Sequence, residues 1–311
     1  MVEIFLKTLP FFALIALGYL AGRTRFFTEE ATAYLTKFVF YFALSAMLFR
    51  FSANLSVTEI FSWPFVWAYL WGTMLVYLIA TFVGLIRRIS VEEIAVESQC
   101  AVIGNVGFLG IPMLVLLLGE AAIGPVMMVL AVDLIVFGSI IVILITGARD
   151  GRMSVRILGS VGMGLIKNPM IVSISLGLLW AATGFPIPAP MNEFLEILGS
   201  AATPGALFAI GASLATKAVN KVSITGYLSV MKLVIHPAAV AYAALFMFPV
   251  EPYAAGVMIA AAALPVAGNV FILAQHYGVA PTRVSATILI TTAISVVTVS
   301  LVIGWVSGLG A

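Results

Sequence analysis

Two long apolar stretches, at 93–118 and 253–277, are each interrupted near the middle by residues that break helices. The first contains VIGNVGFLGIPML and the second contains ALPVAGNVFIL. In a helix interior, glycine costs about 1 kcal/mol and proline about 3 kcal/mol relative to alanine. In lipid, the backbone groups freed by such a break must be satisfied by other protein or by water in a cavity. A pair of interrupted membrane segments is typical of a transporter's binding site.

The composition of the chain indicates a polytopic membrane protein. Of its 311 residues, 63% are hydrophobic and only 9% are charged, with a mean hydropathy of +1.19. Soluble domains carry about 25% charged residues. One cysteine and two histidines exclude a disulfide framework and a clustered metal motif. No P-loop, nucleophile triad or catalytic carboxylate pair is present, so we expect no catalytic residue, no resident cofactor and no nucleic-acid partner.

We expect an all-α membrane protein with ten transmembrane helices, each near the ~20 residues that a bilayer requires. A cleavable signal peptide has basic residues before its apolar run, whereas in this chain Arg23 follows the first run. We therefore expect this run to be a membrane span that is not cleaved. The ten expected spans are 5–22, 31–52, 63–86, 93–118, 123–146, 169–184, 191–216, 223–248, 253–277 and 284–307.

The basic residues predict the orientation in the membrane. If the N-terminus lies outside, eleven of the 15 Lys and Arg residues fall in inner loops. Because cytoplasmic loops are enriched in Lys and Arg, we expect both termini outside, in a bacterial-type inner membrane. The eleven residues are Arg23, Arg25, Arg87, Arg88, Arg149, Arg152, Arg156, Lys167, Lys217, Lys221 and Arg283, and the expected outer loops carry acids, including Glu59.

The two halves of the chain resemble each other. Pro10 and Gly18 have the same spacing as Pro169 and Gly177, and the triplet Gly-Asn-Val occurs at 104–106 and at 268–270. We therefore predict a duplicated five-helix unit, at 1–146 and 169–311, joined by a cytoplasmic linker at 147–168. An odd number of spans per unit inverts the second copy, as in alternating-access transporters.

Asn105 and Asn269 are the first candidates for the substrate site. Each amide offers two donors and an acceptor, and each follows a break at which a half-helix directs its positive N-terminus towards the crossing point. The alternative is that the two asparagines only donate hydrogen bonds to unpaired backbone carbonyls of the other broken segment. Gly107 belongs to a stripe of glycines that lets two helices cross closely, and we expect Pro112 to begin the outer half-helix.

Asp133 lies deep in the fifth expected span, where an ionisable residue is a functional candidate by default. Its expected partners are His236 and Lys232 of the eighth span, and the estimated depths favour His236. The pair could take up and release a proton; the alternative is a static polar cluster. We expect Glu97 near the inner surface, and Arg50 as an anchor in the membrane interface.

Five stretches, GNVGFLGIPM, KNPMIVSISLGLL, LGSAATPGALFAIGASLA, LPVAGNVFILAQHYGV and RVSATILITT, resemble the auxin efflux carrier family, which includes bacterial malonate and malate permeases. The resemblance implies a fold similar to that of bile-acid symporters, with a panel of helices 1, 2, 6 and 7 beside a core of helices 3–5 and 8–10. It implies a substrate site at the crossover of helices 4 and 9, at Asn105, Pro112, Pro265 and Asn269, and an elevator movement of the core.

The sequence therefore predicts a secondary transporter of a small organic anion, a carboxylate such as malonate, malate or an auxin-like acid. Proton coupling is favoured because Asp133 and His236 form the mid-depth titratable pair, with Lys232 nearby. Sodium coupling through unwound carbonyls and polar oxygens is the first alternative. A membrane sensor that transports nothing is the second. The expected partners are the substrate anion, the lipid bilayer and, as a candidate, a second copy of the chain.

Overall fold

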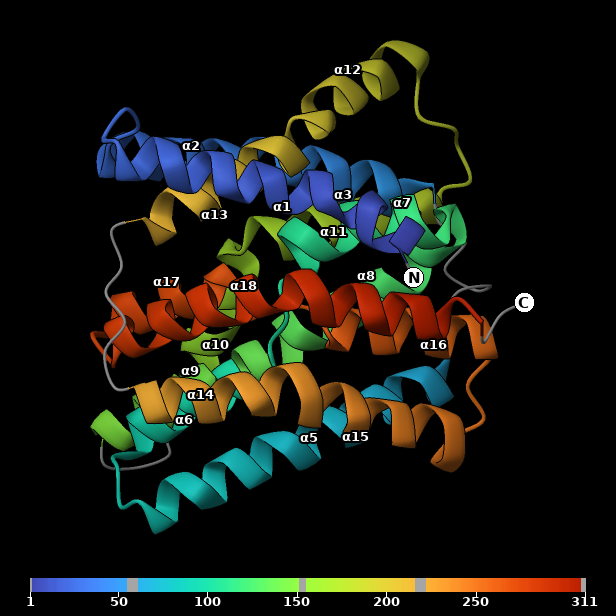
Figure 1. The fold of residues 1–311 in the computed structure, drawn as a ribbon. Helices are drawn as coiled ribbons and strands as arrows, with labels where there is room; N and C mark the ends of the chain where they lie inside the picture. Colours follow the sequence, from blue (N-terminus) through green and yellow to red (C-terminus); the bar gives the residue numbers. More distant parts are fainter. Residues whose placement is uncertain (1, 55–60, 151–154, 216–221, 309–311) are drawn as a thin grey trace.

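The computed structural model describes residues 2–54, 61–150, 155–215 and 222–308, and in these ranges the secondary structure is helical apart from one isolated β-bridge (Figure 1). Seven of the described helical runs are long and apolar enough to cross a membrane. These runs are Leu6–Arg23, Glu29–Ala53, Trp63–Ile86, Glu120–Arg149, Ala189–Leu214, Ser223–Met247 and Pro281–Val306. All-helical architecture and membrane-spanning length are thereby confirmed.

In the first part of the chain, several runs are divided by short π-helical or 3-10 turns, labelled η. The elements are α1 (Val2–Arg23), α2 (Glu29–Phe38), η1 (Val39–Ala43), α3 (Leu44–Ala53), α5 (Trp63–Ile86), α6 (Val91–Val102), η2 (Val106–Gly110), α7 (Ile111–Leu118), η3 (Glu120–Ala122), α8 (Ile123–Val132), η4 (Asp133–Phe137), α9 (Gly138–Asp150) and α10 (Val155–Lys167).

The second part of the chain is built in the same way. Its elements are α11 (Pro169–Ala182), α12 (Ala189–Ser200), α13 (Ala202–Leu214), α14 (Val222–Val230), η5 (Met231–Ile235), α15 (His236–Tyr242), η6 (Ala243–Met247), α16 (Pro252–Ala262), α17 (Gly268–Tyr277) and α18 (Pro281–Val306).

Local capping residues fix where several of these helices begin. Ser62 and Ser90 accept hydrogen bonds from backbone N–H groups in the first turns of α5 and α6. Asn168 caps α11, whose first residue is Pro169, and Glu251 caps α16. Such residues satisfy donors that the first helical turn leaves free, and proline is tolerated there for the same reason.

One group of helices, which we call the panel, consists of α1, α2, α3, α11, α12 and α13. Within it, α1 packs along α13, while α11 and α12 pack against α3. The contact between α1 and α13 is backbone on backbone: a Cβ added to Gly211 would lie 1.9 Å from the Ile15 carbonyl oxygen, and one added to Gly18 would lie 2.1 Å from the Phe208 carbonyl oxygen. In Figure 1, most of the panel forms the upper layer.

The remaining helices from α5 to α9 and from α14 to α18 form a second group, which we call the core. α5 packs against α6 and α15, α16 packs against α8, α15 and α18, and α18 also contacts α14 and α17. α1 begins and α18 ends at the same end of the molecule (Figure 1). The opposite end carries Arg87 and Arg283, where α5 ends and α18 begins.

The structure adds detail to two expectations about individual segments. In the stretch at 147–168, which we expect to link the two halves, α9 continues to Asp150 and α10 occupies Val155–Lys167, with a bend of 70° before α11. Arg50, which we expect to be an interfacial anchor, donates from Nε to Asn192 Oδ1 and from Nη2 to Glu196 Oε2, both at 3.0 Å. The linker and the anchor stay predictions.

Some predictions lie outside what the structure tests. Glu59, Arg152, Lys217 and Lys221, which bear on the orientation, lie outside the described residues. The duplication into 1–146 and 169–311 stays a prediction.

Candidate functional site

The two interrupted segments cross each other at their breaks. α6 ends at Val102, and helical structure resumes at Val106; α16 ends at Ala262, and α17 begins at Gly268. Between these ends, Gly104 and Val266 form an antiparallel β-bridge. The Asn105 N–H donates to the Pro265 carbonyl at 2.8 Å, and the Ala267 N–H donates to the Ile103 carbonyl at 3.1 Å. Each break therefore satisfies backbone groups that the other leaves free, as the absence of water in lipid requires.

Small and polar side chains make this close approach possible. A Cβ added to Gly104 would lie 3.2 Å from the Ala261 carbonyl oxygen and 3.4 Å from the Leu264 Cβ, so a larger residue would require the two broken segments to shift. The Val266 N–H, on the far side of the bridge, donates to Thr291 Oγ1 of α18 at 3.2 Å. The crossing is thus fixed by contacts from three segments of the core.

The two half-helices that start at the crossing direct their N-termini into it. α17 is preceded by Ala267, which provides no side-chain cap, and the buried Asn269 Oδ1 has no hydrogen-bond partner. The first break resumes as the π-helical turn η2, in which the Asn105 carbonyl accepts from both Leu109 and Gly110. N–H groups and the partial positive charge at a helix N-terminus favour an anion there.

Pro112 lies in the first turn of the α-helix α7, as predicted, but a π-helical turn precedes this helix. Helical structure resumes earlier, at Val106, and Pro112 is the second residue of α7. The π-helical turn η2 restores helical hydrogen bonding before the proline, and Ile111 separates the two.

A cavity of about 590 Å³ lies between the panel and the core. α2, η1 and α13 line it on the panel side, and η2, α17 and α18 line it on the core side. Its charged residues are Glu29 and Lys37, and Phe108 and Gly268 bring it next to the crossing. Other polar side chains that line it are Thr32, Thr36, Ser213, Gln275 and Ser285.

None of the five residues predicted to bind substrate lines this cavity directly. Asn105, Gly107 and Pro265 are buried in the crossing, whereas Asn269 and Pro112 are half-buried. Gly107 and Asn269 are the immediate neighbours of Phe108 and Gly268, which do line the cavity. Two of the five predicted residues, Gly107 and Asn269, are therefore one position along the chain from the cavity wall.

A second polar cluster is buried in the core behind the crossing. Asp133 begins η4, Lys232 lies in η5, and His236 begins α15; all three are at most 4% exposed. Lys232 Nζ donates to the carbonyl of Ala262, the last residue of α16, at 2.5 Å and lies 3.2 Å from His236 Nδ1. The ammonium thus occupies the C-terminal, negative end of a half-helix, where a cation is favoured.

The predicted pair between Asp133 and His236 is absent. The Tyr69 hydroxyl of α5 donates to Asp133 Oδ1 at 2.8 Å, and the Tyr69 ring packs edge-on against the His236 ring, with centroids 6.1 Å apart. Tyr69 therefore separates the two residues. His236 Nε2 instead contacts Thr73 Oγ1 at 3.1 Å. The prediction compared the depths of Asp133 and His236 in the membrane, and a depth alone does not show that a third helix, α5, lies between the two residues.

Sequence reasoning missed Tyr69 and Thr73. The available signal was their spacing of four residues in an otherwise apolar segment, which places both side chains on one face of a helix. Tyr77 continues the same face one turn further. In a uniformly apolar helix, polar residues at this spacing indicate the face that meets other protein.

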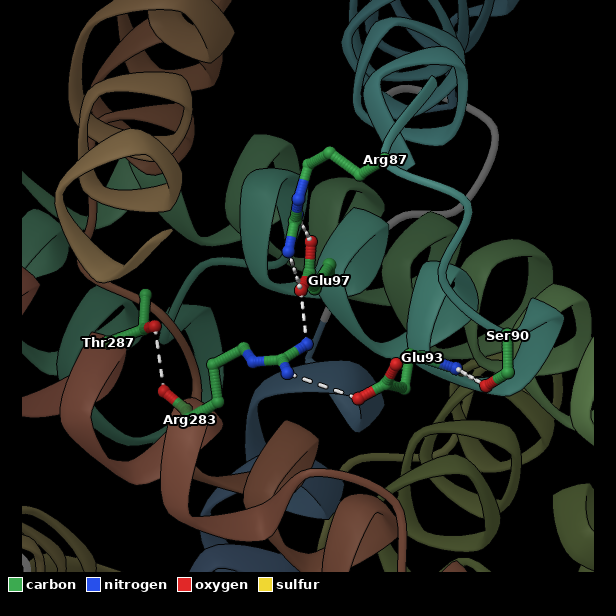
Figure 2. A network of polar contacts seen from close by, with 6 residues as sticks. All are labelled: Arg87, Ser90, Glu93, Glu97, Arg283 and Thr287. Atoms are coloured by element: carbon green, nitrogen blue, oxygen red, sulfur yellow. Dashed lines mark hydrogen bonds and ion pairs between the residues drawn. The ribbon is translucent and has the colours of Figure 1, made fainter. Parts of the chain in front are cut away.

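A third cluster, at the end of the core opposite the chain termini, is made of paired charges (Figure 2). Glu97 of α6 is bound by Arg87 at 2.5 Å and by Arg283 of α18, and Arg283 also binds Glu93 at 3.1 Å. Glu97 is predicted to lie near the inner surface of the membrane, and its depth stays a prediction; within the protein its side chain is buried, only 3% exposed. The end of α5 and the start of α18 cover it, which local sequence did not indicate.

The chain matches known membrane proteins over nearly its full length. Residues 3–303 match the model of the membrane transport protein family. The chain is 33% identical over 306 residues to a Rhizobium meliloti protein described as "Putative malonate transporter", covering 96% of this chain and 95% of the relative. It is 24% identical over 307 residues to an uncharacterized transporter of Methanocaldococcus jannaschii, covering 94% and 95%. The chain therefore belongs to the membrane transport protein family, that of the auxin efflux carriers.

Proposed function

We propose that the protein is a secondary transporter of a small organic anion, and that it binds the anion where the two broken segments cross. The observation that carries this proposal is the antiparallel bridge between Gly104 and Val266, from which two half-helices start. In this proposal, the broken segments are the fourth and ninth of ten membrane crossings, and the two halves of the chain form an inverted repeat. Broken helices at the centre of an inverted repeat are the usual substrate site of such transporters.

The charges around the cavity support a carboxylate as the substrate. The N-terminus of α17 offers N–H groups on the core side, with Asn105 and Asn269 beside it. On the panel side, the cavity is lined by one positive residue, Lys37, and one negative residue, Glu29. The half-helix N-terminus on the core side and Lys37 on the panel side could each hold one carboxylate of a small dicarboxylate, and one relative carries the name of a malonate transporter. We therefore propose malonate as the first substrate to test.

We further propose that the core moves along the panel as in an elevator. The cavity lies on the boundary between these two groups, so movement of the core would carry the crossing past the panel. With both termini outside, the inner end of the membrane is the one that carries Arg87 and Arg283, and the cavity lining includes Glu29 and Ser285, near the starts of α2 and α18. This orientation follows the distribution of positive charge in a bacterial-type inner membrane.

For coupling, the geometry favours protons over sodium. In sodium-coupled transporters with broken helices, unwound carbonyls and half-helix C-termini coordinate the ion. Here the Ala262 carbonyl at the end of α16 already binds the Lys232 ammonium. Asp133 Oδ2, by contrast, is buried and has no hydrogen-bond partner, so it is free to accept a proton. We propose that Asp133 takes up the coupling proton.

The transport assignment is tested with the purified protein in proteoliposomes. We expect saturable uptake of radiolabelled malonate, with competition by other small dicarboxylates. The assignment would be contradicted if the folded protein moved no organic anion when dicarboxylates, keto acids and aromatic acids are tested under imposed proton and sodium gradients.

Coupling is tested in the same vesicles. We expect that replacing sodium with choline leaves uptake unchanged, and that dissipating the pH gradient abolishes accumulation. Asp133→Asn should then transport without dependence on the pH gradient. Retention of pH-driven accumulation by Asp133→Asn would rule out Asp133 as the proton acceptor.

A further inference from the structure

We infer that Tyr69 and Thr73 of α5 are positioning residues that determine which member of the buried Asp133, Lys232 and His236 cluster carries the exchangeable proton. This inference rests on the proposed proton coupling and adds two residues to it. Both residues lie on one face of α5 and both are buried, with Tyr69 1% and Thr73 0% exposed. Neither lines the cavity between panel and core, so they act on the cluster and not on the substrate.

The contact with Lys232 defines the state of His236. A charged ammonium has three N–H donors and no acceptor. With Lys232 charged, the 3.2 Å contact with its Nζ requires His236 Nδ1 to be the unprotonated nitrogen of the ring. The ring is then neutral, its proton is on Nε2, and Nε2 donates to Thr73 Oγ1 at 3.1 Å. Thr73 thus holds His236 as a neutral, singly protonated imidazole.

This arrangement leaves Asp133 as the proton acceptor. Its Oδ1 is held by the Tyr69 hydroxyl at 2.8 Å, and its Oδ2 has no partner. The titratable groups that face it are Tyr69 from α5 and Lys232 from η5, and Lys232 is engaged by Ala262 and His236 instead of forming an ion pair with Asp133. In the binding step, one proton adds to Oδ2 and the carboxylate becomes a neutral acid, still held by Tyr69.

The structure provides a matched control on the same helix. Tyr77 lies two turns along the same face of α5, is 3% exposed, and its hydroxyl has no hydrogen-bond partner. Tyr69→Phe and Tyr77→Phe therefore each remove one buried hydroxyl from one helix, but only the first removes a bond to Asp133. A general effect of repacking α5 would appear in both variants.

The first experiment measures the pH dependence of uptake together with the infrared band of the protonated Asp133 carboxyl, assigned by its loss in Asp133→Asn. Because the phenol stabilises the charged carboxylate, Tyr69→Phe should move both midpoints to higher pH by about one unit, the scale of a hydrogen bond to a charged group. Tyr77→Phe should leave both midpoints unchanged. Equal midpoints for Tyr69→Phe and the wild type, or equal shifts in both variants, would overturn the role of Tyr69.

The second experiment observes His236 by ¹⁵N NMR in a His276→Gln background, which leaves one histidine. The wild type and Thr73→Ser should show one neutral tautomer with the proton on Nε2, whereas Thr73→Val should show exchange between tautomers. A protonated ring in the wild type, or an unchanged spectrum in Thr73→Val, would overturn the role of Thr73.

The infrared and NMR readouts do not require transport. If the wild type moved no organic anion but the Tyr69→Phe midpoint shifted as expected, the proposed function would fail while the positioning roles would stand. If transport were proton-driven and neither spectroscopic change occurred, the positioning roles alone would fail.

Discussion

The contact inside the panel differs in kind from the contact between the panel and the core. Inside the panel, the backbones of α1 and α13 touch at Gly18 and Gly211, and a single added carbon would clash with main-chain oxygen. At the boundary, a carbon added to Gly107 would meet side chains only: the end of the flexible Met170 at 2.6 Å, with Leu130 at 3.8 Å and Leu44 at 4.0 Å. Aromatic rings also meet there, with the centroids of Phe40 and Phe108 6.4 Å apart.

The difference indicates which parts can move relative to each other. Backbone contacts fix two helices at one register, because main chain cannot be repacked. Side-chain contacts around a 590 Å³ cavity can be exchanged at small cost. The proposed elevator movement needs this combination of two rigid groups and a deformable boundary. Four substitutions test it, and we order them by the expected loss of stability.

The largest loss is expected inside the core. Glu97→Gln would leave Arg87 and Arg283 without their shared buried carboxylate, and removal of one partner from a buried ion pair costs about 3–5 kcal/mol. We expect a marked fall in the half-denaturation temperature in detergent. Glu93→Gln is the control: its side chain is 32% exposed, and the pair should contribute only about 0.2–1 kcal/mol. Equal effects of the two substitutions would show that the network does not hold the core together.

Inside the panel, Gly211→Ala should destabilise the protein by about 1–3 kcal/mol or more, because its Cβ would lie 1.9 Å from the Ile15 carbonyl oxygen. Gly226→Ala in α14 is the matched control, since nothing lies within 4 Å of its added carbon. The control should be neutral or stabilising, as alanine is favoured in helices. Thermal denaturation of both variants measures the difference, and a tolerated Gly211→Ala would contradict the account of a rigid panel.

At the boundary, Gly107→Ala should have a smaller effect on stability, about 1 kcal/mol, because Met170 can move away. We expect its effect on transport to be larger than its effect on stability, since Gly107 adjoins the cavity. Comparison of uptake rate with denaturation temperature measures both. If stability fell as much as in Gly211→Ala, the boundary would not be deformable.

The smallest loss is expected for Ser300→Ala. Ser300 of α18 and Thr8 of α1 form a buried hydroxyl pair at 2.9 Å that joins core and panel. Hydrogen bonds inside membrane proteins contribute on average about 0.6 kcal/mol. We expect little change in denaturation temperature but a change in apparent malonate affinity, because the pair should form in only one position of the core. An unchanged affinity would show that this contact persists through the transport cycle.

The sequence was sufficient to predict the breaks and their crossing. Gly104, Pro265 and the two asparagines are local signals, and in lipid each break needs a partner, which the other break supplies. The lateral partners could not be predicted. The spacing of Tyr69, Thr73 and Tyr77 indicates which face of α5 meets other protein, but it does not indicate that Asp133 and His236 lie opposite that face. The burial of Glu97 likewise depends on Arg283, 186 residues away in the chain.

The most direct test of the crossing as the substrate site is malonate uptake by the Asn105→Ala, Asn269→Ala double variant in proteoliposomes. Neither side chain forms part of the backbone bridge between Gly104 and Val266, so the variant should fold, as judged by gel filtration and thermal denaturation. We predict that uptake falls at least tenfold and that malonate no longer raises the denaturation temperature. A folded double variant with wild-type uptake would contradict the account.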